Sequence, residues 1–255
     1  MNAGVLRDAF TQVCHSRVSA RAFRQDEIPR NVLRRVLELT QCSPSSFNLQ
    51  PYKMVVVQSA AQREALSSAM LGPGNIQRVR DAPVTVVFAA DRDPAQLTRR
   101  VMKLELENGA DPNYVSGLPS KVSFLLGKGV LSTAFRAVAT HLLSPLAPSP
   151  KIAPSLDGWA CKNAGLAAGT FLLAAQAHGL ASAPMEGFDE RRVGFILGVP
   201  AERYSIPLVI CIGYPQQEQE QEQRPIEGPL PPRRRFPLSE VACDDKFTSP
   251  FSAES

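Results

Sequence analysis

Continuous apolar runs alternate with segments whose apolar residues recur at helical spacing, and this pattern predicts an α/β or α+β fold. Short runs rich in valine and isoleucine predict buried strands at residues 54–57, 84–89 and 204–212. Helical spacing and helix-start signals predict helices at residues 3–14, 29–41, 60–70 and 189–197.

The most apolar stretch of the chain lies at residues 157–178 and predicts one long helix. Across residues 164–177 only Thr170 and Gln176 are polar, so we expect this helix to be buried on most sides. Its alanines and glycines allow a second backbone to approach closely, and Gly179 is placed to end it. The helix therefore predicts either the spine of one subunit or the contact between two.

Two parts of the chain lack a clear period. Residues 92–156 contain charged helical pieces, a turn at 111–113 and an apolar stretch at 122–143, and we expect them to form an insertion or lid over a site. Residues 216–223 form a polar, low-complexity linker. The apolar segment 238–251 predicts packing against another part of the protein or against a partner subunit.

Composition narrows the class of protein. At 255 residues, with 44% hydrophobic and 20% charged residues, the chain is long enough for one large domain or two small ones. The net charge of +4 favours an anionic ligand and is too small to indicate nucleic acid. Five scattered cysteines without a CxxC pair predict reduced, mostly buried thiols in an intracellular protein. The N-terminus lacks the apolar region of a secretory signal, so we expect a cytoplasmic location, or a mitochondrial one if a presequence has been removed.

The residues that carry chemistry indicate binding rather than acid–base catalysis. There is no HExxH motif and no nucleophile elbow, and the three histidines have no carboxylate partner near them in sequence. The segment 17–21 (RVSAR) suits a phosphate, and Arg233–Arg235 forms a second basic cluster. The loop 42–52 is rich in serine and asparagine, and a Pro-Met-Glu-Gly turn occupies 184–187. Together these segments predict a bound anionic cofactor; solvated basic surfaces and a plain turn are the alternatives.

Five stretches of the sequence, taken in order, resemble the FMN-dependent nitroreductase family of the oxygen-insensitive NAD(P)H type. The matching stretches are RVSARAF, SPSSFNLQPY, NIQRVRDAPVTVVFAA, NAGLAAGTFLLAAQAHGLASAPMEGFD and PRRRFP. They cover most of residues 12–91 and 157–247, whereas residues 92–156 contain no matching motif. Each stretch alone is a weak indication, but five in the family's order make the resemblance specific.

The resemblance implies an α+β fold, with a mixed α/β sheet flanked by helices, that binds FMN as an intertwined homodimer. Two FMN sites would lie at the subunit interface, and the helix 157–178 would be the central helix of the dimer. The whole chain, residues 1–255, would form a single nitroreductase domain with a lid at about 92–156. A polar linker at 216–224 would lead to a C-terminal arm, residues 225–255, that crosses onto the partner subunit.

The resemblance also implies which residues contact the cofactor, and it implies no certain catalytic side chain. The phosphate and ribityl chain would be held by Arg17, Ser19, Arg21, Arg233 and Arg235. The partner subunit would line the flavin with Pro44, Ser45, Ser46 and Asn48. The pyrimidine end of the ring would meet Asn75 and Arg78. Along the ring would lie Pro184, Met185, Glu186 and Gly187, with the backbone N–H of Glu186 or Gly187 near the reactive N5 atom.

For activity, the resemblance implies an oxidoreductase that uses FMN and NADH or NADPH to reduce nitroaromatic compounds, quinones or both. Hydride transfer through flavin N5 would follow a ping-pong cycle at one site. Reductive dehalogenation and enone reduction, other flavin reactions of the superfamily, stay open, and the former would need lid residues that grip a zwitterion. Candidates for that role are Glu105, Glu107, Tyr114 and Lys121. A non-enzymatic basic binding protein is a further alternative; on the leading interpretation we expect neither nucleic-acid binding nor a membrane span.

Overall fold

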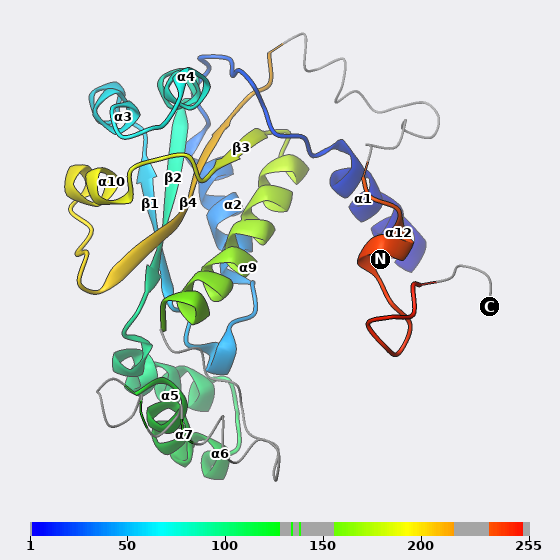
Figure 1. Ribbon diagram of the computed structural model, residues 1–255, viewed down its shortest axis with the longest axis vertical. Coiled ribbons are helices and arrows are strands. Elements are labelled where there is room, and N and C mark those ends of the chain that lie inside the picture. The colour runs from blue at the N-terminus through cyan, green and yellow to red at the C-terminus, as the bar shows by residue number, and fades with distance from the viewer. Residues whose placement is uncertain (1, 128–133, 135–137, 139–155, 217–234, 252–255) are drawn as a thin grey trace.

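A four-stranded antiparallel sheet forms the centre of the protein (Figure 1). The computed structural model describes residues 2–127, 134, 138, 156–216 and 235–251. The strands, in spatial order, are β1 (Tyr52–Val57), β2 (Val84–Asp91), β4 (Tyr204–Gly213) and β3 (Ala181–Met185). A parallel component is present as an isolated bridge between Ser19 and Ser182 at the outer edge of β3. The predicted α+β class is therefore confirmed.

Helices cover both faces of the sheet because its strands are apolar on both sides. Alternate residues of β2 face opposite layers: Val86 and Phe88 pack with α2 (Arg30–Gln41) and α9 (Leu156–Ala177). Val87 lies in the other layer. The helices near that second layer are α3 (Ala60–Ser67), α4 (Pro73–Asp81) and α10 (Glu190–Leu197). The continuous apolar runs that predicted strands are explained by this double burial.

The long helix α9 meets the sheet with small side chains. Its buried residues recur at helical spacing: Ala160, Asn163, Ala164, Ala167, Ala168, Phe171, Ala174 and Ala175. The ring of Phe171 packs edge-on against Phe88 of β2, with centroids 5.7 Å apart. Gly179, at φ 72°, ends the helix as predicted. On the other side Leu166 is 52% exposed, so the expected burial on most sides is not reached within one chain.

A small helical subdomain occupies the described part of the predicted lid. It contains η2 (Pro94–Leu97), α5 (Thr98–Glu107), α6 (Pro112–Ser116) and α7 (Leu118–Leu126). Val101, Leu118 and Val122 form its core, and Phe47 and Trp159 from outside the subdomain pack against that core. Asp111 begins α6 by accepting a hydrogen bond from the Asn113 N–H, where the sequence predicted only a turn. Most of the apolar stretch at 122–143 lies outside the described residues.

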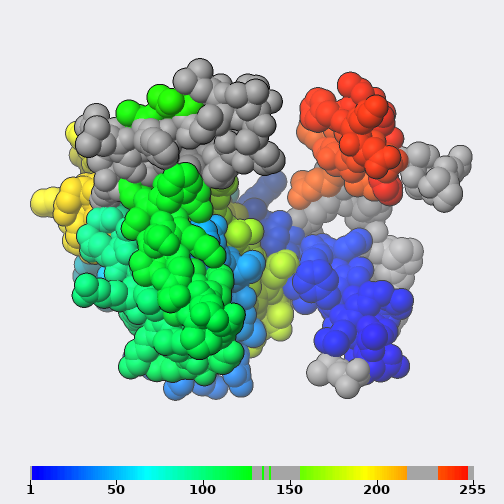
Figure 2. All heavy atoms as spheres, turned by 90° about the horizontal axis from the view of Figure 1, so that it is seen from below, coloured from blue at the N-terminus to red at the C-terminus, as the bar shows by residue number. Residues whose placement is uncertain are grey.

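The N-terminal helix and the C-terminal segment lie on the same side of the molecule, away from the sheet (Figures 1 and 2). Helix α1 (Ala3–Ser16) is predicted correctly, yet none of its residues is buried, and Phe10 is 60% exposed. In the C-terminal segment, which contains α12 (Leu238–Val241), Phe247 is 96% exposed. Both segments therefore present apolar side chains that the described chain leaves uncovered.

Three further predictions need correction or restriction. Helix α3 ends at Ser67 rather than at 70, because Met70 forms a bridge with Phe188. The cysteines are unpaired as expected, but the prediction that most are buried is wrong, since Cys14, Cys42 and Cys243 are exposed. No helix among the described residues is long and apolar enough to cross a bilayer. The predicted linker lies outside the described residues beyond position 216.

Candidate functional site

The segment that follows α1 runs along the free edge of β3. Ser19 bridges Ser182, and the Ala20 N–H donates to the Ser182 carbonyl at 2.8 Å. The buried hydroxyl of Ser182 has no hydrogen-bond partner among the described residues. A buried polar atom without a partner marks a place where a ligand or water can supply the missing bond.

Helix α4 joins this segment to the turn after β3. The Arg78 guanidinium donates to the Ala20 carbonyl at 3.1 Å and to Asn75 Oδ1 at 2.8 Å. The Asn75 amide in turn donates to the carbonyls of Leu71 and Gly187, at 3.1 and 3.2 Å. The structure therefore brings together three predicted pieces: segment 17–21, the Asn75/Arg78 pair and the turn 184–187.

The turn after β3 presents backbone donors. Pro184 and Met185 belong to β3, and Glu186 is exposed. Among the hydrogen bonds of the described residues, none is donated by the backbone N–H of Glu186 or Gly187. A Cβ added at Gly187 would lie 2.7 Å from Asn75 Nδ2, so a side chain here would collide with the amide that braces the turn. Glycine at this position leaves room for the Asn75 amide.

Arg17, two residues before Ser19, lies near enough to Arg235 for their positive charges to interact. Burial, and then the positive charge of Arg235, lower the pKa of Arg17. Within the described part of the chain, Arg17, Arg21 and Arg235 form no ion pair with a carboxylate. Neighbouring positive charges that no carboxylate neutralises favour the binding of an anion. Arg233, predicted to join them, lies outside the described residues.

The remaining predicted residues form a second group in the loop between α2 and β1. Phe47, Asn48 and Gln50 have φ values of 55°, 53° and 45°, in the left-handed region that non-glycine residues disfavour. The Ser46 N–H donates to the buried Asn163 Oδ1 of α9 at 2.9 Å, and the Gln50 N–H donates to Ser45 Oγ at 2.9 Å. Pro44 and Ser46 are exposed at its surface.

The first group, made up of segment 17–21, the Asn75/Arg78 pair and the turn 184–187, and the second group lie at opposite ends of α9. Asn163 contacts the second group, whereas Gln176 donates to Ser16 Oγ, next to the first group, at 3.1 Å. Asn163 and Gln176 are thirteen positions apart on this helix, which corresponds to about 20 Å. One chain therefore does not bring all the predicted residues to a single site.

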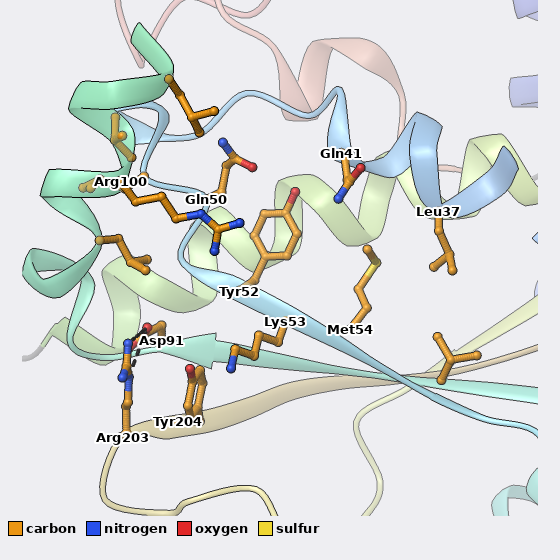
Figure 3. Close-up of a pocket in the computed structure, with 15 residues that line it drawn as sticks. Leu37, Gln41, Gln50, Tyr52, Lys53, Met54, Asp91, Arg100, Arg203 and Tyr204 are labelled. Atoms are coloured by element: carbon orange, nitrogen blue, oxygen red, sulfur yellow. Dashed lines mark hydrogen bonds and ion pairs between the residues drawn. The ribbon is translucent and has the colours of Figure 1, made fainter. Parts of the chain in front are cut away.

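A separate cavity of 620 Å³ lies among β1, α2 and α5 (Figure 3). Leu37, Met54 and other apolar side chains line it, together with the cationic Lys53, Arg100 and Arg203. Arg203 is bound to the buried carboxylate of Asp91 at 2.7 Å. No predicted cofactor residue lines this cavity, and because its walls come from several elements, no single stretch of sequence indicated it.

Two residues that support the second group were not predicted as site residues. Asn163 lies on α9, and Glu105 Oε1 of α5 accepts a hydrogen bond from Asn48 Nδ2 at 2.7 Å. From its position in the sequence, Glu105 was a candidate only for gripping a zwitterion. The partner Asn48 is 57 positions away in the chain, so neither spacing nor period could have indicated the contact.

Comparison with known proteins defines the class. A sequence model of the protein family described as "Nitroreductase family" matches residues 15–214, so the chain belongs to the nitroreductase family. The resemblance is confirmed, and with it the coarse prediction of an oxidoreductase of this family.

Individual relatives agree with this assignment. The chain is 32% identical over 202 residues to a protein named NADH dehydrogenase from Thermus thermophilus, covering 79% of this chain and 84% of the relative. It is 25% identical to the solved structure of a putative nitroreductase, ydfN, from Bacillus subtilis, with a TM-score of 0.70 and 92% and 98% of the two chains covered. A putative nitroreductase in complex with FMN from Exiguobacterium sibiricum shares the fold at 19% identity and a TM-score of 0.66, with 91% and 95% covered.

Proposed function

We propose that this protein is an FMN-dependent NAD(P)H oxidoreductase that reduces nitroaromatic compounds, quinones or both. The observation that carries the proposal is the hydrogen-bonded cluster that joins segment 17–21, the Asn75/Arg78 pair and the turn 184–187, next to the buried Ser182 hydroxyl that has no partner among the described residues. The printed names of relatives support it, since they include NADH dehydrogenase and NAD(P)H nitroreductase, and one structural neighbour contains FMN.

The donors of the first group fit the parts of FMN. A phosphate carries close to two negative charges at neutral pH, and Arg17, Arg21 and Arg235 supply guanidinium groups for charge-assisted hydrogen bonds. Ser19 adds a hydroxyl beside them for the ribityl chain. Arg233 would add a further cation to this end of the site.

The ring end of the cofactor would meet α4 and the turn. Asn75 and Arg78, already bonded to each other, would present an amide and a positive charge to the pyrimidine edge. The backbone N–H groups of Glu186 and Gly187, which donate no hydrogen bond among the described residues, would donate to the ring near N5. When bound, FMN would supply the redox chemistry, taking a hydride from NADH or NADPH and passing it to the acceptor in a ping-pong cycle. The chain's own residues bind and orient, and no side-chain acid or base is required.

A second copy of the chain would complete the site. In the proposed homodimer, Pro44, Ser45, Ser46 and Asn48 of one copy line the flavin held by the other. Uncovered apolar residues support such an assembly: Leu166 on α9, Phe10 on α1 and Phe247 in the C-terminal segment. We propose that the C-terminal arm, residues 225–255, crosses onto the partner, and that the whole chain is one domain. The helical subdomain would shape access to the flavin for an aromatic acceptor.

Absorption spectroscopy tests the function directly. We expect the purified protein to show flavin bands that bleach on anaerobic addition of NADH or NADPH and return with a nitroaromatic compound or quinone. The double variant R17A/R235A is expected to lose bound FMN, whereas the control R34A/R35A, which removes the same charge from the exposed surface of α2, keeps it. A colourless protein that cannot be loaded with FMN would refute the proposal.

The oligomer is tested by a change on α9. Leu166→Glu places a charge on the open side of the helix, where the side chain is exposed in a single chain. We expect sedimentation velocity to show a shift from dimer to monomer, with loss of FMN in parallel. A variant that stays dimeric and flavin-loaded would show that this side of α9 is not the contact.

A further inference from the structure

We infer that Glu105 is a positioning residue that orients Asn48 in the flavin-lining loop and so links α5 to the cofactor site. The inference rests on the proposed function, because Asn48 is assigned to the flavin there. It extends that function by giving the helical subdomain a defined contact with the site, in addition to any effect on access.

Both ends of the Asn48 amide are occupied. Its Nδ2 donates to Glu105 Oε1 at 2.7 Å, and its Oδ1 accepts from Gln50 Nε2 at 3.1 Å. A carboxylate accepts hydrogen bonds, so it selects the nitrogen end of the amide. A bond to a charged group is also shorter and stronger than one between neutral groups. Glu105 therefore fixes which end of the Asn48 amide faces which way.

The loop needs such external support. Three of its residues, Phe47, Asn48 and Gln50, hold left-handed backbone angles that persist only when surrounding contacts enforce them. The side-chain hydrogen bonds that reach the loop from other elements come from Asn163 of α9 and Glu105 of α5. Phe47 also packs against the core of the helical subdomain. The loop conformation thus depends on α5 as well as on the central helix.

Glu105 has no competing polar role in the described structure. Its carboxylate forms no ion pair with a described lysine or arginine. Glu107 lies two positions further along the same helix, on a different face, and pairs with Lys103 at 3.7 Å. Both carboxylates belong to α5 and differ in what they touch. Glu107 therefore offers a matched control.

The test combines FMN titration with hydrogen exchange of the cofactor-free protein. Glu105→Ala is expected to raise the FMN dissociation constant about tenfold, the usual scale for losing a hydrogen bond to a charged group. It is also expected to speed exchange of the amides at 46–50. Glu105→Gln keeps an acceptor oxygen and is expected to stay within about threefold of the wild type. Glu107→Ala is expected to match the wild type in both measurements.

A polarity reversal separates positioning from general support of the fold. Asn48→Asp sets two carboxylates against each other and is expected to weaken FMN binding. Adding Glu105→Gln restores one donor and one acceptor and is expected to recover part of that loss. A structural role of Glu105 alone predicts no such rescue.

Distinct outcomes overturn the inference and the proposed function. The inference is overturned if Glu105→Ala changes neither FMN affinity nor exchange. It is also overturned if the losses in Asn48→Asp and Glu105→Gln are additive. In either case the proposed function stands as long as the wild-type protein binds FMN. If Glu105→Ala does not fold, the reversal pair decides. A wild-type protein that takes up no FMN overturns the function, and the exchange data then decide whether Glu105 holds the loop.

Discussion

Replacing Gly187 by alanine tests the bracing of the turn after β3. The new Cβ would lie 2.7 Å from Asn75 Nδ2, whereas ordinary contacts begin at 3.4 Å, so the amide must retreat by about 0.7 Å. Its bonds to the Leu71 and Gly187 carbonyls, at 3.1 and 3.2 Å, would then be lost. At about 1 kcal/mol each, this amounts to about 2 kcal/mol of destabilisation.

A smaller opposing effect comes from the unfolded chain. The backbone of Gly187 does not lie in the left-handed region, so alanine fits its conformation. Alanine also reduces the entropy of the unfolded state, which stabilises the protein by roughly 0.4–1 kcal/mol. The expected net loss in the free energy of unfolding is therefore about 1–1.5 kcal/mol.

Urea unfolding at fixed protein concentration measures this change. Gly158→Ala is the control, because a Cβ there has no neighbour within 4 Å, and it is expected to leave stability unchanged or raise it. In an Asn75→Ala background the collision partner is gone, so only the unfolded-state effect is left and Gly187→Ala is expected to raise stability by roughly 0.4–1 kcal/mol. An equal loss in both backgrounds would show that Asn75 does not brace the turn.

Three further outcomes follow from packing, charge and burial. Phe171→Ala is expected to lower the free energy of unfolding by about 3–5 kcal/mol, whereas the exposed Phe195→Ala changes it by less than about 0.5 kcal/mol; chemical denaturation distinguishes them. Arg203→Leu leaves the buried Asp91 carboxylate without its cation and is expected to cost about 3–5 kcal/mol by the same measurement. Burial raises the pKa of Cys211 to about 12, so its thiol stays protonated at pH 8 and is expected to resist iodoacetamide until the protein is unfolded, as mass mapping would show. Rapid labelling of native Cys211 would contradict the described core.

The elements predicted best are those whose signal is local. The run at 204–212 became β4 because both of its faces are buried, and Gly179 ended α9 as its backbone freedom suggested. Helix α4 was missed because it starts with Pro-Gly and buries only Val79, which leaves almost no apolar period to detect. Strand β1 begins at Tyr52 rather than at Met54, because Tyr52 and Lys53 pair with β2. A run of apolar residues in the sequence does not reveal that pairing.

The candidate site was predictable to a different degree. The first group follows chain motifs, and the structure brings them together through Ser182, Arg78 and Asn75. The supports of the second group were not predicted as such, because Asn163 is 117 positions from Ser46 and the contact exists only in the folded chain. The cavity beside Lys53 was missed for the same reason.

The separation of the two groups along α9 has a genetic consequence. If each flavin takes one group from each of two copies, a chain with a damaged Arg17 and a chain with a damaged Asn48 fail separately in the same way. Mixed in one cell, they form hybrid dimers by the isologous contact. Each hybrid has one site that carries both defects and one that carries neither. Two inactive alleles would then complement each other, which no pair of alleles damaged in the same group can do.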